Sequence, residues 1–261
     1  MMQRRRPIAP VQQGQTAEQQ TPRVWIAADY HFPSTYSCRI PMSSMNSASA
    51  MPAPGPATVR LALLRTGIEL FGRDRVRDEL LPILRSAVVR IRPPERVTIS
   101  QQRIRGYKWS EDRQKRKTIQ ESIIVRELAH ARRPMTVFLL VPQESEQRMR
   151  PLLHAIGYWG QSSSLTSCLG VSYTQPVPGE CATPLALLDG TLPLRPFFTC
   201  LVTEFRSDQL AWDDIVPGDG TPRTQALRLD VYVWPMIMDY RHGTDKLLVR
   251  SPLLESGKSR T

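Results

Sequence analysis

Short apolar runs rich in β-branched and aromatic residues recur along the chain and predict strands. The predicted strands cover residues 23–30, 87–91, 96–104, 135–141, 165–173, 197–205 and 227–234. Residues 118–128 carry isoleucines and a valine that fit both the helical and the strand period, so both assignments stay open there.

Helices are predicted at three places. Residues 57–71 carry apolar side chains at helical spacing, with a proline in the first turn and a glycine after the end. Residues 74–84 predict a second helix or turn, and residues 144–156 predict a further helix, although Pro151 near its middle conflicts with regular helix geometry.

The order of these elements predicts an α+β fold with an antiparallel core, in which a βαβ-containing first half precedes a mostly β second half. The expected organisation has three parts. They are a disordered tail over residues 1–22, a domain over residues 23–157 with a basic insertion at 101–118, and a β-rich C-terminal region over residues 158–261.

The chain is basic, and its charge lies in the first half. It has 35 Lys and Arg against 24 Asp and Glu, a net charge of +11. Residues 1–133 hold 24 Lys and Arg against 11 Asp and Glu (+13), whereas residues 134–261 hold 11 against 13 (−2). A generally basic protein kept soluble by its charge does not explain this asymmetry, so a polyanion is expected to meet the first half.

The cysteines and the N-terminal residues bear on compartment and cofactors. Cys38, Cys168, Cys181 and Cys200 form no C-x-x-C pair and have no histidine at metal-ligand spacing, so no metal is expected. Scattered cysteines fit a reducing cytoplasm. Residues 1–22 are basic and Gln-rich without an apolar centre, and no apolar run could span a bilayer, so no secretory signal and no membrane partner are expected.

The most distinctive polar segment is a predicted loop over residues 103–117. It combines seven cations with two aromatic residues: Arg103, Arg105, Tyr107, Lys108, Trp109, Arg113, Lys115, Arg116 and Lys117. The cations can neutralise phosphates, and aromatic rings can stack on bases, worth about 1–3 kcal/mol per base. A solvated loop is the usual alternative for a charge run, but the embedded aromatic residues favour RNA binding.

A second candidate lies at the start of the first predicted helix. Tyr36 and Arg39 stand in the long polar loop over residues 31–55, and Thr58 and Arg60 stand in the first helical turns. A loop of this length is usually functional or disordered. The unpaired N–H groups of a first helical turn suit a phosphate, although the local sequence alone favours an ordinary well-capped helix.

A third candidate is the segment Tyr-Trp-Gly-Gln-Ser-Ser-Ser at residues 158–164. Its Gly160 permits close approach of a ligand or another chain, and Ser162 supplies a hydroxyl. A serine-rich turn without a ligand is the alternative, because such turns are common.

These three features, in this order, resemble the fifth family of CRISPR-associated proteins, the Cascade subunit of the RAMP superfamily that caps the 5′ handle of the guide RNA. That family enters its first helix through a Pro-x-Thr-hydrophobic-Arg turn, as residues 56–60 do, and then has a basic thumb-like insertion and a later Gly-x-Ser element like residues 160–162. The resemblance covers residues 23–175. A glycine is frequent in the family where this chain has Leu61, which is a departure in the first helix.

The resemblance implies a ferredoxin-like, RNA-recognition-type domain that binds the 5′ handle of guide RNA without catalysis or cofactor. It also implies docking to the backbone and large subunits of a CRISPR effector complex, with target DNA nearby. Two alternatives stay open. One is a guide-RNA-processing endoribonuclease of the same superfamily, for which His31 beside Tyr30 is the one pairing worth noting; the other is a stand-alone RNA-binding protein.

Overall fold

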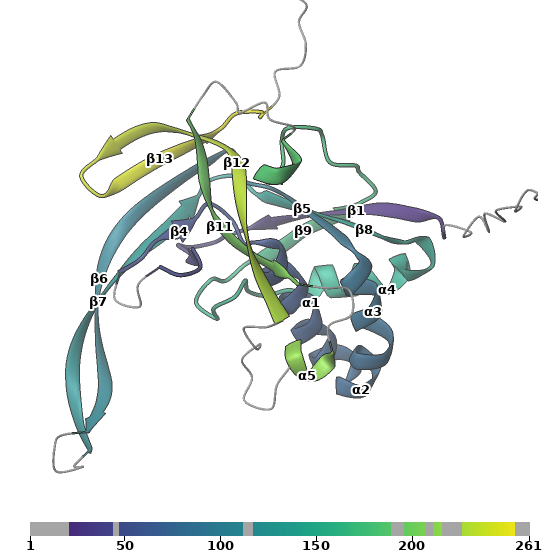
Figure 1. The fold of residues 1–261 in the computed structure, drawn as a ribbon, viewed down its shortest axis with the longest axis horizontal. Coiled ribbons are helices and arrows are strands. Elements are labelled where there is room, and N and C mark those ends of the chain that lie inside the picture. The colour runs from purple at the N-terminus through teal and green to yellow at the C-terminus, as the bar shows by residue number, and fades with distance from the viewer. Residues whose placement is uncertain are drawn as a thin grey trace, which may run out of the picture.

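The first sheet has four antiparallel strands and fixes the topology of the protein. The computed structural model describes residues 21–43, 47–111, 117–188, 196–206, 211–215 and 226–253. The four strands are β1 (Arg23–His31), β5 (Val88–Arg92), β8 (Met135–Pro142) and β9 (Ser167–Ser172). They lie in the order β5-β8-β1-β9, and every neighbouring pair is antiparallel (Figure 1).

Two helical connections cover one face of this sheet. The first runs from β1 to β5 through α1 (Pro56–Phe71), α2 (Arg73–Arg75), the π-helical turn η1 (Val76–Leu80) and α3 (Leu81–Ser86). The second runs from β8 to β9 through a 3₁₀ turn, η2 (Gln143–Ser145), and α4 (Glu146–Ala155). This β-α-β-β-α-β order with strands arranged 2-3-1-4 is the ferredoxin-like arrangement, so the α+β fold class expected from the sequence is confirmed.

The main core lies between the helices and the sheet. Alternate residues of β1, among them Ile26 and Tyr30, point to the helical side, and Leu63 of α1 and Leu152 of α4 pack against that side. α1 approaches η1 closely at Gly67, where an added Cβ would lie 2.7 Å from Leu80 Cδ2. The helical spacing of apolar residues in α1 therefore serves this core directly.

The second sheet joins both halves of the chain. It contains β3 (Ser47–Ala48), β6 (Arg96–Glu111), β7 (Lys117–Ala131), β10 (Thr183–Pro184), β12 (Leu227–His242) and β13 (Asp245–Arg250), in the order β10-β12-β13-β6-β7-β3. β11 (Phe197–Phe205) pairs with β12. A short 3₁₀ turn, η3 (Leu185–Leu187), follows β10, and α5 (Trp212–Ile215) follows β11.

The boundary expected after residue 157 does not coincide with a boundary between sheets. β9 lies beyond it in sequence yet completes the first sheet, and β13 pairs with β6, so Lys246 stands opposite Ile99. Strand pairing of residues far apart in sequence produces this arrangement, and no local pattern reports it.

The long polar segment between β1 and α1 is built into the core. β2 (Cys38–Arg39) pairs with β4 (Ala50–Met51), and Tyr36 forms a bridge with Ala129 of β7. Ala53 and Met51 are buried. The described part of this segment is therefore ordered by backbone pairing with β7.

Candidate nucleic-acid interface

A long two-stranded arm is the most prominent feature of the surface (Figure 1). β6 and β7 pair continuously from Val97–Ala131 at the base to Glu111–Lys117 near the tip. β13 pairs with β6 only over residues 96–99, and β3 pairs with β7 only at Val125 and Arg126. The prediction of a loop over residues 103–117 is therefore wrong for most of its length. Residues 118–128, whose apolar positions fitted both the helical and the strand period, form a strand.

One face of this arm combines positive charge with an aromatic ring. Arg103, Arg105 and Tyr107 alternate along β6, so they share a face, with Ile123 opposite Arg105 in the register. Tyr107 is 76% exposed and Ile123 is 63% exposed. Arg105 lies 3.6 Å from Glu121, but both side chains are well exposed, so this ion pair is weak and leaves the face accessible.

The structure describes only some of the other residues predicted to bind RNA in this segment. Lys108, Trp109 and Lys117 lie in the paired strands, opposite Gln120, Ile119 and Glu111. The remaining cations, Arg113, Lys115 and Arg116, lie outside the described residues.

The start of α1 does not offer the open phosphate site that its sequence suggested. β11 crosses it: an added Cβ on Gly55 would lie 2.6 Å from Val202 Cγ1, and Pro56 and Ala57 are buried. Thr58 alone in this turn is half-buried. The non-local packing of β11 therefore removes the first-turn amides from solvent, and this part of the prediction is wrong.

Arg60 is a structural residue. Its side chain is buried, donates to the carbonyl oxygens of Leu84 (3.0 Å) and Ala87 (2.8 Å), and forms an ion pair with Glu204 of β11. Burial lowers the pKa of Arg60 and raises the pKa of Glu204, because in each case it disfavours the charged form. The expected contact of Arg60 with RNA is replaced by this bridge between α1 and the second sheet.

Tyr36 is likewise part of the core. Its ring stacks on Phe32 with 3.8 Å between centroids, and its hydroxyl donates to the carbonyl of Pro52 at 2.6 Å. Burial raises the pKa of Tyr36 well above its ordinary value. Arg39, by contrast, is exposed and donates through Nε to Ser43 Oγ at 3.2 Å, so it is accessible as predicted.

The Gly160 turn is exposed and lies beside the other predicted features. Gly160 has φ +69°, a conformation that favours glycine, and an added Cβ would lie 3.6 Å from Thr58 Cγ2. Ser162 is exposed in the same turn. The fold therefore brings the third sequence feature against the second.

Contacts that the sequence did not reveal join this turn to its neighbours. Ser164 Oγ accepts the backbone N–H of Ser37 at 3.1 Å, and Arg126 of β7 donates to Gln161 at 3.4 Å. Arg65 of α1 lies 3.4 Å from the centre of the Tyr158 ring. Arg126 stands opposite Gln102 at the base of the arm, on the other face from Arg103 and Arg105, so it adds a cation there without extending their face.

Groups that could support catalysis or metal binding are sparse in the described part of the chain. No cluster there of three or more His, Cys, Asp or Glu side chains could hold a metal ion. His130, His154 and His242 are exposed at separate places, and His31 is half-buried with its carbonyl accepting the Thr166 hydroxyl. Among the described residues, no helix is long and apolar enough to cross a membrane.

Topology and surface together define the class of the protein: a ferredoxin-like α+β fold with a second antiparallel sheet and a basic, aromatic arm. The sequence is 32% identical over 103 residues to the CRISPR-associated protein Cas5 of Archaeoglobus fulgidus, a match that covers 40% of this chain and 45% of that protein. The resemblance found in the sequence is therefore confirmed, and the matched region spans less than half of the relative's length. No family model matches the chain.

Two solved structures are similar in outline. One is a crystal structure of a CRISPR protein from Archaeoglobus fulgidus, with a TM-score of 0.46 and 13% identity, covering 87% of this chain and 92% of that one. The other is a CRISPR RNA-guided surveillance complex, with a TM-score of 0.32 and 9% identity, covering 88% and 91%. At these scores the likeness adds nothing to the argument.

Proposed function

We propose that the protein is a non-catalytic, RNA-binding subunit of a CRISPR effector complex that holds the 5′ handle of the guide RNA. The similarity to Cas5 supports the assignment to such a complex. The observation that carries RNA binding is the arm, whose exposed face presents Arg103, Arg105 and Tyr107 together. In this proposal the protein also docks to backbone and large subunits and lies near target DNA.

The chemistry of the arm matches single-stranded RNA. Guanidinium groups neutralise phosphates, and an exposed tyrosine ring stacks on a base irrespective of sequence. The ion pair of Arg105 with Glu121 is long and exposed, so a phosphate can replace Glu121 at little cost. In this proposal Trp109 and the cations Lys108, Arg113, Lys115, Arg116 and Lys117 also contact the RNA.

In this proposal the RNA passes around the base of the arm to its other face. There Arg126 reaches Gln161 in the Gly160 turn, and Gly160 lies beside Thr58. Since Gly160 and Ser162 are exposed, backbone and hydroxyl groups of the turn are accessible to a sugar or phosphate. Arg39 adds a further exposed cation from the neighbouring loop.

Titration of RNA binding against salt tests the proposal. The probe is a fluorescent single-stranded repeat RNA from the CRISPR array nearest the gene. Arg103→Ala with Arg105→Ala should reduce the magnitude of the log-affinity against log-salt slope by about 1.4, at about 0.7 per phosphate contact on a single strand. The matched control is Arg77→Ala with Arg148→Ala, which removes the same charge from the helical side and should leave the slope unchanged.

Stacking is tested separately at Tyr107. Tyr107→Ala should weaken binding by about 1–3 kcal/mol, whereas Tyr107→Phe keeps the ring and should bind like the natural protein. An equal loss in both variants, or an unchanged salt slope after removal of both arginines, would exclude the arm from the RNA site.

Incubation with repeat RNA separates this proposal from the endoribonuclease alternative. The proposed subunit should bind the RNA without cutting it. Site-specific cleavage that His31→Ala abolishes would instead assign the protein to the processing enzymes. Binding of unrelated RNA with equal affinity, and no association with products of neighbouring CRISPR genes, would favour the stand-alone RNA-binding protein.

A further inference from the structure

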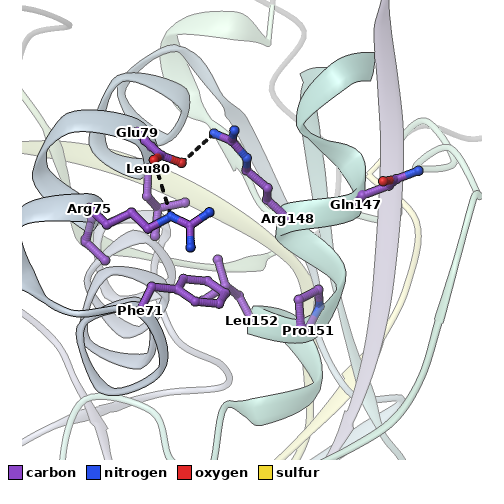
Figure 2. Close-up of a pocket in the computed structure, with 9 residues that line it drawn as sticks. Phe71, Arg75, Glu79, Leu80, Gln147, Arg148, Pro151 and Leu152 are labelled. Carbon is purple, nitrogen blue, oxygen red and sulfur yellow. Dashed lines mark hydrogen bonds and ion pairs between the residues drawn. The ribbon is translucent and has the colours of Figure 1, made fainter.

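A cleft opens on the helical side of the fold, far from the arm. It lies between the end of α1, the α2–η1 segment and α4, and its volume is about 230 Å³. Its apolar wall consists of Phe71, Val76, Leu80, Pro151 and Leu152. Figure 2 shows Phe71, Pro151 and Leu152 facing the same space from two different elements.

Part of the wall of this cleft is exposed to solvent. Phe71 is 38% exposed and Pro151 is also exposed, whereas Val76, Leu80 and Leu152 are buried and form the floor. Pro151 lacks an N–H group, so the carbonyl of Gln147, one turn earlier in α4, cannot receive the usual helical hydrogen bond. The cleft thus combines exposed apolar surface with a backbone acceptor that the helix itself does not satisfy.

The rim of the cleft carries an excess of positive charge. Glu79 accepts from Arg75 Nε at 3.3 Å and lies 2.9 Å from the Arg148 guanidinium through its other oxygen (Figure 2). Two cations therefore share one carboxylate. A guanidinium has five N–H donors, and both side chains are more than half exposed, so each can bind a second carboxylate.

Neighbouring charges do not cancel this excess. Arg77, on the same helical segment, is paired with Asp74 at 3.2 Å and Asp78 at 2.8 Å. Among the residues that line the cleft, Arg75 and Arg148 are the cations and Glu79 is the anion, directly beside the apolar wall. This combination suits an acidic segment with a large apolar side chain better than it suits RNA, which has no aliphatic anchor to fill the wall.

We infer that this cleft docks an acidic segment of a neighbouring protein subunit. One large apolar side chain of that segment packs against Phe71 and Pro151, and a flanking Asp or Glu binds Arg75 and Arg148. The inference rests on the proposed membership of a multi-subunit complex, but it concerns a protein contact on the side opposite the RNA-binding arm.

Site-specific photocrosslinking in the assembled complex tests the contact directly. The chain is co-expressed with the products of its neighbouring CRISPR genes and purified with RNA, with p-benzoylphenylalanine in place of Phe71. We expect a crosslink to one subunit, at a peptide with a large apolar residue within a turn of Asp or Glu. A crosslink to RNA, to a second copy of this chain or to no partner would overturn the inference.

Charge reversal provides the quantitative test. Arg75→Glu should weaken retention of the crosslinked subunit about tenfold, since the introduced carboxylate repels the acidic segment that the guanidinium attracted. Arg77→Glu makes the same change two residues away, outside the cleft, and should alter retention less than about twofold. Equal effects of the two variants would refute the contact. RNA content is measured in parallel: a complex that keeps this contact but holds no RNA would refute the proposed function instead.

Discussion

The ion pair between Arg60 and Glu204 ties the first helix to the second sheet, and its removal tests how the two halves of the chain are held together. The side chains are 8% and 12% exposed, so solvent screens them little. Arg60 also donates to two backbone carbonyls. Burial lowers the pKa of Arg60 and raises the pKa of Glu204, so it disfavours the charged form of both groups. For each group, desolvation therefore outweighs the attraction to its partner.

The expected effects differ sharply between single and double variants. Glu204→Leu leaves a buried guanidinium without a counter-charge and should lower the free energy of unfolding by about 3–5 kcal/mol. Arg60→Met leaves the Glu204 carboxylate without a counter-charge. It also removes the donor from the carbonyls of Leu84 and Ala87, at about 1–3 kcal/mol each. The double variant leaves no buried charge unpaired. Its loss of unfolding free energy should therefore be smaller than the sum of the two single losses by at least about 2 kcal/mol.

Urea unfolding followed by circular dichroism measures this coupling. The exposed pair of Arg77 and Asp78, replaced in the same way, is the control and should show no measurable coupling. Losses for Arg60 and Glu204 that add to within about 0.5 kcal/mol would refute the reasoning, because they would show that neither charge depends on the other.

The same pair predicts a dependence of stability on pH. The pKa of Glu204 in the folded protein is raised above its ordinary value of 4.5, with burial as the main cause. Between these two values the folded state binds more protons than the unfolded state, so the contribution of Glu204 to stability falls as pH rises through that window. Glu204→Gln should abolish this component of the slope, and an unchanged slope would assign the pH dependence to other groups.

Three further substitutions test local features. Tyr36→Phe removes the hydrogen bond to Pro52 and should lower the free energy of unfolding in urea by about 1–3 kcal/mol without changing RNA affinity. Weaker RNA binding at equal stability would show instead that Tyr36 belongs to the RNA interface. Gly67→Ala places a Cβ against Leu80 and should cost about 1–3 kcal/mol by overpacking, so an unchanged melting temperature would show that the contact is loose. Gly160→Ala meets Thr58 Cγ2 only at an ordinary contact distance of 3.6 Å but strains a positive φ, at about 1–2 kcal/mol, and a neutral outcome would show that the turn relaxes.

The elements of the first sheet could be predicted closely from the sequence. The runs at residues 23–30 and 135–141 became β1 and β8, because both are rich in apolar, strand-forming residues that the core buries, such as Ile26 and Val137. α1 begins and ends within one residue of its prediction, since a proline and a glycine mark its ends. In α4, Pro151 is accommodated within the helix, although the pattern indicated a conflict there.

The candidate site could be predicted only in part. Exposure of Arg39, Arg105 and Tyr107 follows from polar and basic neighbours, and the sequence indicated it correctly. Tyr36 and Arg60 belong to the same local motifs, yet both are buried. Their partners at Pro52 and Glu204 are brought to them by loop closure and by β11, and neither contact has a local signature.

By itself, the sequence determined the strands and helices, the basic charge of the first half, and the aromatic residues that stand among the basic residues there. These depend on side-chain period and on charge, which act over a few residues. Only the tertiary structure decided that the basic segment is a paired arm, that β11 covers the start of α1, and that the Gly160 turn meets Thr58. The second and third of these contacts join residues more than a hundred positions apart, and their energies depend on the whole fold. The arm pairs residues that are closer in sequence, but its polar and basic composition predicted a loop.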